Sequence, residues 1–513
     1  MTQKHTPFGA QVASETGPKR ALILAGGGMR LSYQAGAVRA LFEAGLTFSH
    51  VDGTSGGAVN HAMLFSGQGP EEMCDRWRSL NPKDFVSFLP WEKYLEMTDM
   101  QAMGDADNII QKVFPHLGVD VARVRAAEGM VGTFNVCNYT RKINEVIPHE
   151  RITVDYLVAG MSLPGVLPPV KIGEDLYHDS AFMRDANLME AVRRGAEELW
   201  VLWVLGNTDV YKGGVLGLYV NMLEVSANGA LHEEFRQIEE INARIEKGER
   251  VYGHARPIKL HLIKPEYPLP LDPDLYFGNV DNATLIDMGY ADAQGYLKEM
   301  SAEGVPLSPE TTRMKSPRTG ITFRETMSGF FILDETDPKA GEKRGKAAGL
   351  ELAMHAAIDI EDLATFLKDP AHPGRITGRI DFPSFGRNIP AKSGVFNLFH
   401  ATDDPELLLM IYELAFEHEG QTYYLAGKKE VKDDPGFDLW KDTTTLFTQL
   451  HKGPDKSAPV VGAGVLTLSV KDFKNVLSTM HVTHAGSVQE KTKALSGFGR
   501  FFAGSLWESY FGA

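Results

Sequence analysis

The feature that most constrains the fold is a serine between two glycines, where a short apolar segment gives way to a helical one. Gly53, Ser55 and Gly57 form the pattern Gly-x-Ser-x-Gly; residues 48–52 before it are strand-like, and residues 58–65 after it are helix-like. A sharp turn from strand to helix leaves almost no room for side chains beside the serine. The pattern therefore predicts a nucleophile elbow, a turn that presents a serine hydroxyl at the end of a buried strand.

A second glycine-rich turn precedes the elbow by one strand and one helix. Residues 21–25 form a continuous apolar run, as in strands that are buried on both faces, and Gly26, Gly27 and Gly28 follow directly. Glycine N–H groups between a strand and a helix can bind an anion, because no side chain stands in the way. We interpret these glycines, together with Arg30, as a candidate oxyanion site.

The order of the predicted elements gives the domain organisation. Strands and helices alternate through residues 19–302, which predicts an α/β fold of three α/β/α layers with a mostly parallel sheet. Residues 1–18 are expected to be a disordered lead-in, and the Pro-, Thr- and Ser-rich residues 303–327 a linker. Short alternating runs between turn clusters in residues 328–513 predict a β-rich domain, an antiparallel sandwich or barrel.

Composition excludes several classes of protein. The formal net charge of -15 argues against a nucleic-acid partner, and two cysteines are too few for a disulfide framework. The start of the chain lacks the apolar core of a signal peptide, and no apolar run approaches the roughly 18 residues of a membrane span. We therefore expect a soluble, cytoplasmic protein.

Two other kinds of site fit the sequence less well. In a dinucleotide-binding fingerprint, position 31 would have to be glycine, but it is Leu31. The fingerprint also needs an acidic residue about 20 positions further on, and the acidic residue there, Asp52, belongs to the elbow strand instead. This weakens the alternative of a nucleotide-binding oxidoreductase. The segment 232–236, His-Glu-Glu-Phe-Arg, lacks the second histidine of a zinc-binding helix, so no metal site is predicted.

Two further segments complete a recognisable set of motifs. Residues 159–170 read Ala-Gly-Met-Ser-Leu-Pro-Gly-Val-Leu-Pro-Pro-Val, and residues 176–181 read Leu-Tyr-His-Asp-Ser-Ala. With the glycine run and the elbow, these four ordered motifs resemble the patatin-like phospholipase family over roughly residues 19–300. The proline-rich segment matches that family's Ala-Ser-x-Ala-x-Pro-x-x-Phe-Pro-Pro-like stretch, and Asp179 matches the aspartate of its Asp-Gly-Gly or Asp-Gly-Ala motif.

The resemblance implies a lipid acyl hydrolase, a carboxylic ester hydrolase of the phospholipase A, lysophospholipase or esterase type. By the resemblance Ser55 is the nucleophile, Asp179 the general base, and the Gly26–Gly28 run with Arg30 the oxyanion site. An acyl-enzyme is the implied intermediate. Neither a cofactor nor a metal is implied, the substrate is a lipid or acyl ester, and the protein would contact a membrane surface transiently.

Two residues depart from the family pattern. Ser180 follows Asp179 and Leu31 follows Arg30, where the family has glycine. These departures motivate an alternative, a weakly active or inactive patatin-fold protein that binds lipid or serves as a scaffold. His178 is expected to be structural, because neighbouring residues of a strand point to opposite faces.

Other residues near the motifs have structural expectations. Asp185 and Asn187 are expected to cap or order the loop after Asp179. Residues 327–330 and 434–444 weakly resemble a module fused to sterol-oxidase-like and α/β-hydrolase-like enzymes. That resemblance suggests lipid handling, and a packing or oligomerisation domain is the alternative.

Overall fold

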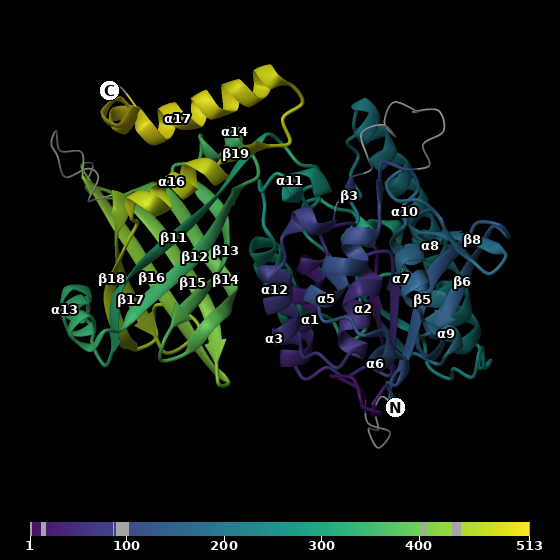
Figure 1. Ribbon diagram of the computed structural model, residues 1–513. Helices are drawn as coiled ribbons and strands as arrows, with labels where there is room; N and C mark the ends of the chain where they lie inside the picture. The colour runs from purple at the N-terminus through teal and green to yellow at the C-terminus, as the bar shows by residue number, and fades with distance from the viewer. Residues whose placement is uncertain are drawn as a thin grey trace. The chain divides into compact units, whose positions relative to one another are not determined.

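The first of two compact units, Met1–Ser316, is built around an eight-stranded sheet with helices on both faces (Figure 1). The structure is a computed structural model that describes residues 3–11, 17–85, 87–88, 102–402, 404, 407–432 and 443–511. The strands of this unit are β1 (Arg20–Leu24), β2 (His50–Thr54), β3 (Ser87–Phe88), β4 (Gly104–Asp105), β5 (Val131–Asn138), β6 (Ile143–Pro148), β7 (Val170–Ile172), β8 (Asp175–His178), β9 (Glu198–Leu202) and β10 (Lys259–Ile263).

The α-helices of the first unit differ greatly in length. They are α1 (Ser32–Glu43), α2 (Gly57–Phe65), α3 (Pro70–Ser79), α5 (Phe114–His116), α6 (Val121–Arg125), α7 (Val154–Met161), α8 (Ala181–Arg184), α9 (Leu188–Arg193), α10 (Gly214–Glu246), α11 (Asp272–Tyr276) and α12 (Asn282–Glu299). The sheet order is β10-β9-β1-β2-β5-β8-β7, with β6 paired to β5. The pairings from β10 to β5 are parallel, whereas β6, β7 and β8 pair antiparallel.

Alternation along the central strand explains the layers. Leu22 and Leu24 of β1 pack into a core that includes residues of α1, α2, α3, α7 and α12. Ala21 and Ile23 point the other way, into a core with residues of α9 and α10. Because both faces of β1 are buried from Ala21 onward, its sequence is apolar from Ala21 to Leu24. The predicted α/β/α arrangement with a mostly parallel sheet is confirmed.

The second unit, Pro317–Ala513, is an antiparallel barrel with helices outside it (Figure 1). Its strands are β11 (Gly320–Leu333), β12 (Glu351–Ile360), β13 (Pro373–Phe382), β14 (Gly386–Ala401), β15 (Leu407–His418), β16 (Gln421–Lys432), β17 (Thr445–His451), β18 (Val460–Thr467) and β19 (His481–Thr483). Its helices are α13 (Pro338–Ala348), α14 (Leu363–Phe366), α16 (Val470–Thr479) and α17 (Val488–Phe511). Each strand from β11 to β18 pairs with the next, and β18 returns to β11, which closes the barrel. The predicted β-rich domain is confirmed, as a barrel and not a sandwich.

Two segments at the expected domain boundaries carry structure. Residues 3–11 of the expected lead-in form main-chain hydrogen bonds, such as the 2.8 Å bond from the Gln11 N–H to the Phe48 oxygen. Strand β11 begins at Gly320, inside the segment that the Pro, Thr and Ser content predicts as a linker. The Pro, Thr and Ser content of the segment does not indicate this strand, although apolar and polar residues already alternate from Ile321 onward. Among the described residues, no helix combines the length and the apolar character needed to cross a lipid bilayer.

The crossing of α1 and α12 requires glycine and gives a stability test. A Cβ at Gly289 would collide with the main-chain oxygen of Tyr33. We expect Gly289→Ala to lower the free energy of unfolding by roughly 1–3 kcal/mol, because overpacking forces two backbones apart. Calorimetric unfolding of the whole chain measures the effect as a lower midpoint for the first unit.

The matched control lies on the same helix. Gly295 of α12 is exposed, and a Cβ there meets nothing within 4 Å. Gly295→Ala should therefore be neutral or stabilising by up to about 1 kcal/mol, through helix propensity. Equal midpoints for the two variants would contradict the close crossing.

Candidate active site

The elbow at the end of β2 has the geometry that its glycines predict. Ser55 adopts a positive φ of 51°, between the last residue of β2 and the first turn of α2. A Cβ at Gly57 would collide with the main-chain oxygen of Leu24, and one at Gly53 would lie 3.0 Å from the Cα of Ala58. Gly57 therefore allows α2 to approach the end of β1 this closely, and Gly53 allows α2 to fold back onto its own strand, β2.

The antiparallel strand β8 returns the chain toward the elbow. Asn135 of β5 lies opposite Thr54, and two residues further along β5 Cys137 lies opposite His178. Because β8 runs antiparallel to β5, the residue after His178 arrives at the level of residue 55. That residue is Asp179.

The side chains of Ser55 and Asp179 form a short hydrogen bond. Ser55 Oγ donates to Asp179 Oδ2 at 2.6 Å, and the Ala181 N–H donates to Asp179 Oδ1 at 2.8 Å. Ser55 is 7% exposed and Asp179 is 1% exposed. Burial raises the pKa of Asp179 to about 7, against the opposing effect of the two hydrogen bonds. A carboxylate with this pKa can accept a proton near neutral pH.

The imidazole of His178 contacts the main chain and not Ser55. Its Nδ1 lies 2.8 Å from the main-chain oxygen of Asp179, while the Asp179 carboxylate faces Ser55. The hydrogen-bond partner of the serine is therefore a carboxylate and not this imidazole.

The glycine-rich turn after β1 lies beside the elbow. A Cβ at Gly26 would lie 2.9 Å from the Cβ of Ser55, and Gly28 has a φ of 58°. Arg30, 8% exposed, donates from Nε to the Gly27 oxygen at 2.9 Å. The Gly27 oxygen and the Gly28 N–H belong to one planar peptide and point in opposite directions. Arg30 thus fixes the direction of the Gly28 N–H.

An aspartate from α11 holds the other side of this turn. Asp272 Oδ1 accepts a 3.1 Å hydrogen bond from the Met29 N–H and lies 3.7 Å from Arg30 Nε. A Cβ at Gly28 would come within 2.5 Å of Asp272 Oδ2. The turn is therefore anchored through main-chain groups and one ion pair, and the position of Gly28 excludes a side chain.

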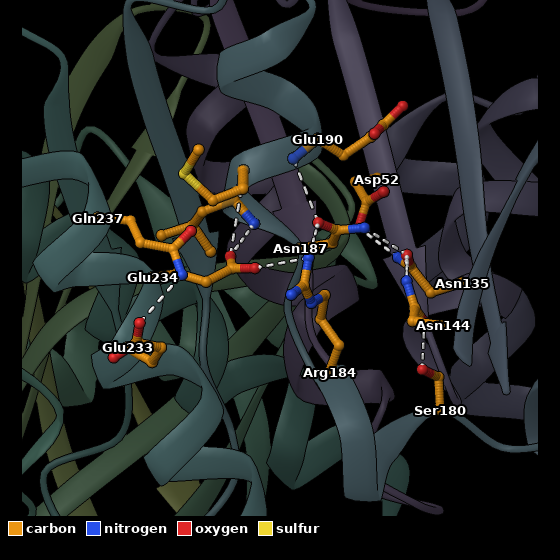
Figure 2. Close-up of polar contacts among 12 residues, drawn as sticks. Asp52, Asn135, Asn144, Ser180, Arg184, Asn187, Glu190, Glu233, Glu234 and Gln237 are labelled. Carbon is orange, nitrogen blue, oxygen red and sulfur yellow. Dashed lines mark hydrogen bonds and ion pairs between the residues drawn. The ribbon is translucent and has the colours of Figure 1, made fainter. Parts of the chain in front are cut away.

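A polar network links Ser180, the residue after Asp179, to side chains of neighbouring strands and helices (Figure 2). Ser180 donates to Asn144 Oδ1, and Asn144 donates to Asn135 Oδ1 at 3.1 Å. Asn187 donates to the same Asn135 oxygen at 2.7 Å, and Asn135 in turn donates to Asp52 Oδ1 at 2.7 Å. The serine that replaces the family glycine is thus part of a connected set of side chains.

The network continues to α10. Asn187 caps α9 by accepting from the Glu190 N–H at 3.2 Å, which confirms the expected capping role. Arg184 lies 3.0 Å from Glu234 Oε1, and Glu234 Oε2 accepts from the N–H groups of Leu188 and Met189 (Figure 2). Strand β5 also carries Thr133 and Asn138, so no single polar residue marked Asn135 in the sequence. No sequence pattern indicated Glu234.

The chain is similar to known proteins over part of its length. The chain is 28% identical over 188 residues to an uncharacterized NTE family protein of Mycobacterium tuberculosis, covering 36% of this chain and 30% of that one. It is 24% identical over 312 residues to Lysophospholipase NTE1 of Phaeosphaeria nodorum, covering 59% of this chain and 20% of that one. The chain thus spans less than a third of the length of these curated relatives.

The chain also resembles a solved structure, and a family model matches part of it. The crystal structure of VipD from Legionella pneumophila aligns with a TM-score of 0.30 and 12% identity, over 58% of this chain and 71% of that chain. The family model described as patatin-like phospholipase matches residues 22–192, a range that includes both glycine-rich turns, Ser55 and Asp179. The chain therefore contains a patatin-like phospholipase domain.

Proposed function

We propose that this protein is a serine hydrolase that cleaves the acyl esters of lipids through a Ser55–Asp179 dyad. The observation that carries the proposal is the 2.6 Å hydrogen bond between the two side chains, at a strained elbow beside a turn of bare glycines. The family match supports a lipid substrate. The relative named a lysophospholipase supports phospholipid and lysophospholipid esters in particular.

The first half of the reaction forms an acyl-enzyme. Ser55 Oγ attacks the ester carbonyl carbon and gives its proton to Asp179 Oδ2, while the carbonyl π electrons move to the oxygen. The N–H groups of Gly27 and Gly28 stabilise this oxyanion, and each such donor is worth roughly 2.7–4 kcal/mol of the barrier. The Gly26 N–H, which the sequence also suggested as a donor, is already bonded to the Asp185 main-chain oxygen. When the carbonyl re-forms, the alcohol leaves and takes the proton back from Asp179.

The second half releases the acid. Asp179 accepts a proton from a water molecule that attacks the acyl carbon. When the tetrahedral intermediate collapses, the bond from the acyl carbon to Ser55 Oγ breaks, Ser55 Oγ takes that proton back from Asp179, and the acid is released. Arg30 acts as a positioning residue, because its bond to the Gly27 oxygen keeps the Gly28 N–H directed to one side.

Removal of either dyad member tests the proposal. We expect Ser55→Ala to reduce the hydrolysis of a p-nitrophenyl ester by at least about a thousandfold, and Asp179→Asn by at least about a hundredfold. Ser79→Ala on the exposed end of α3 is the matched control and should keep the wild-type rate. A fluorophosphonate should label wild type and Ser79→Ala, and mass spectrometry should find the adduct on Ser55. Equal hydrolysis rates in all variants would remove the proposal.

The acidic limb of the pH profile should report Asp179. The base acts in its ionised form, so kcat/KM should fall as the pH drops through about 7, the pKa to which burial raises this group. Initial rates between pH 5 and 9 measure the limb on the folded enzyme. A limb near pH 4, where an exposed aspartate titrates, would show that the base is not this buried carboxyl.

The departure at Ser180 can be tested directly. Ser180→Gly restores the family residue and removes the hydrogen bond to Asn144, so we expect a loss of about 1 kcal/mol of stability. The rate should change by less than about threefold, because the Ala181 N–H still holds the Asp179 carboxylate. A rise in kcat/KM of tenfold or more would instead mean that Ser180 misaligns the base.

A further inference from the structure

A second buried carboxyl adjoins the nucleophile, and the dyad mechanism leaves it without a role. Asp185 ends α8 and is 2% exposed. Its main-chain oxygen accepts a 3.3 Å hydrogen bond from the Gly26 N–H. A Cβ built on Gly26 would collide with Asp185 Oδ1 and would lie 2.9 Å from the Cβ of Ser55. Asp185 Oδ1 and Ser55 therefore face the same side of Gly26, at the glycine-rich turn.

The surroundings of Asp185 favour its neutral form. Oδ2 is buried and accepts no hydrogen bond from any residue that the structure describes. An ionised carboxylate with an unsatisfied buried oxygen is costly, whereas a protonated one avoids most of that cost. Burial, and then the like charge of Asp179, raise the pKa of Asp185 to about 8.

Two other groups face Asp185 and oppose this effect only in part. Arg30 favours the ionised form, but its Nε is engaged with the Gly27 oxygen and lies 3.7 Å from Asp272. The Gly26 N–H also favours the ionised form. By contrast, two donors, the Ser55 hydroxyl and the Ala181 N–H, hold the carboxylate of Asp179. The two neighbouring carboxyls are thus placed in environments that separate their protonation states.

We propose, building on the proposed function, that Asp185 is a further catalytic residue that works as a neutral acid and donates a hydrogen bond to the ester oxygen attacked by Ser55. The position of its Oδ1 beside Gly26 and Ser55 carries the inference. Asp179 takes the proton of Ser55 in this reaction, and Asp185 keeps its own proton throughout. The hydrogen bond strengthens as negative charge develops on the ester oxygen, in addition to the bonds from the glycine N–H groups.

The inference predicts an alkaline limb in the pH profile. Loss of the Asp185 proton removes the donor and places a negative charge beside the oxyanion, so the reaction slows as the pH rises through about 8. Together with the acidic limb of Asp179, this gives a bell-shaped profile. The two apparent pKa values of this profile belong to Asp179 and Asp185 together, because the two carboxyls interact.

The test compares Asp185→Asn with Asp185→Leu in the full-length protein. The second-order rate constant for fluorophosphonate labelling of Ser55 is measured from pH 6 to 10, with the thermal unfolding midpoint of each variant. Asn keeps a donor that does not titrate, so Asp185→Asn should retain at least about a third of the wild-type rate at pH 7 and lose the alkaline limb. Leu keeps the size without a donor, and Asp185→Leu should slow labelling by roughly 100-fold.

Each outcome bears on a different statement. An alkaline limb that persists in Asp185→Asn would overturn the inference, even if Asp185→Leu does not fold. A drop in Asp185→Asn to the rate of Asp179→Asn, at an unchanged unfolding midpoint, would overturn it too, since an ionised carboxylate would then be required. If wild type is not labelled at Ser55 at any pH, the proposed function fails, and the inference fails with it.

Discussion

The close approach of the elbow to the end of β1 is the constraint on which the site depends. Helix α2 begins so near the Leu24 oxygen that only glycine is tolerated at position 57. This approach places the glycine-rich turn and Ser55 side by side, although a whole helix separates them in the sequence. Any side chain at Gly57 would separate the two strand ends, and Ser55, the proposed nucleophile, would lie further from the N–H groups of the glycine-rich turn.

Burial then gives the site its chemistry. An exposed aspartate has a pKa near 3.9 and is a poor base at neutral pH, so a dyad without imidazole needs a desolvated carboxyl. The same desolvation acts on Asp52, whose pKa is raised to about 8 by burial, and there two side-chain donors, Thr133 and Asn135, satisfy the carboxyl. Burial therefore raises the pKa of Asp52, Asp179 and Asp185 alike, and the hydrogen bonds that reach these carboxyls oppose it only in part.

Local sequence signals predicted the parts of the site that depend on main-chain geometry. The apolar run at 21–25 and the glycine pattern around Ser55 gave β1, the elbow and α2 nearly to the residue. The hydrogen bond between Ser55 and Asp179 depends on the register of β5 with β8, which no local pattern encodes. That pairing came only from the family resemblance.

Long-range pairing also explains what the sequence left open in the second unit. Alternating runs predicted strands, but a sandwich and a barrel use the same alternation. The choice depends on whether β18 returns to β11, a pairing between residues such as Phe331 and Gly464 that lie far apart in the sequence. Likewise, residues 495–511 belong to the helix α17, although they are rich in phenylalanine and glycine, which do not favour a helix.

The two departures from the family pattern are accommodated by contacts elsewhere in the domain. A Cβ at Gly56 would lie 2.5 Å from Leu31 Cδ1, so the Leu31 side chain fills the space beside this glycine. The larger residue after Arg30 is thus matched by a glycine after Ser55. The Ser180 hydroxyl reaches Asn144, whose amide joins that of Asn187 on a single oxygen of Asn135 (Figure 2). A glycine at position 180 would leave the Asn144 oxygen without this donor. The larger residues are therefore integrated into the packing around the dyad, and neither one stands between Ser55 and Asp179.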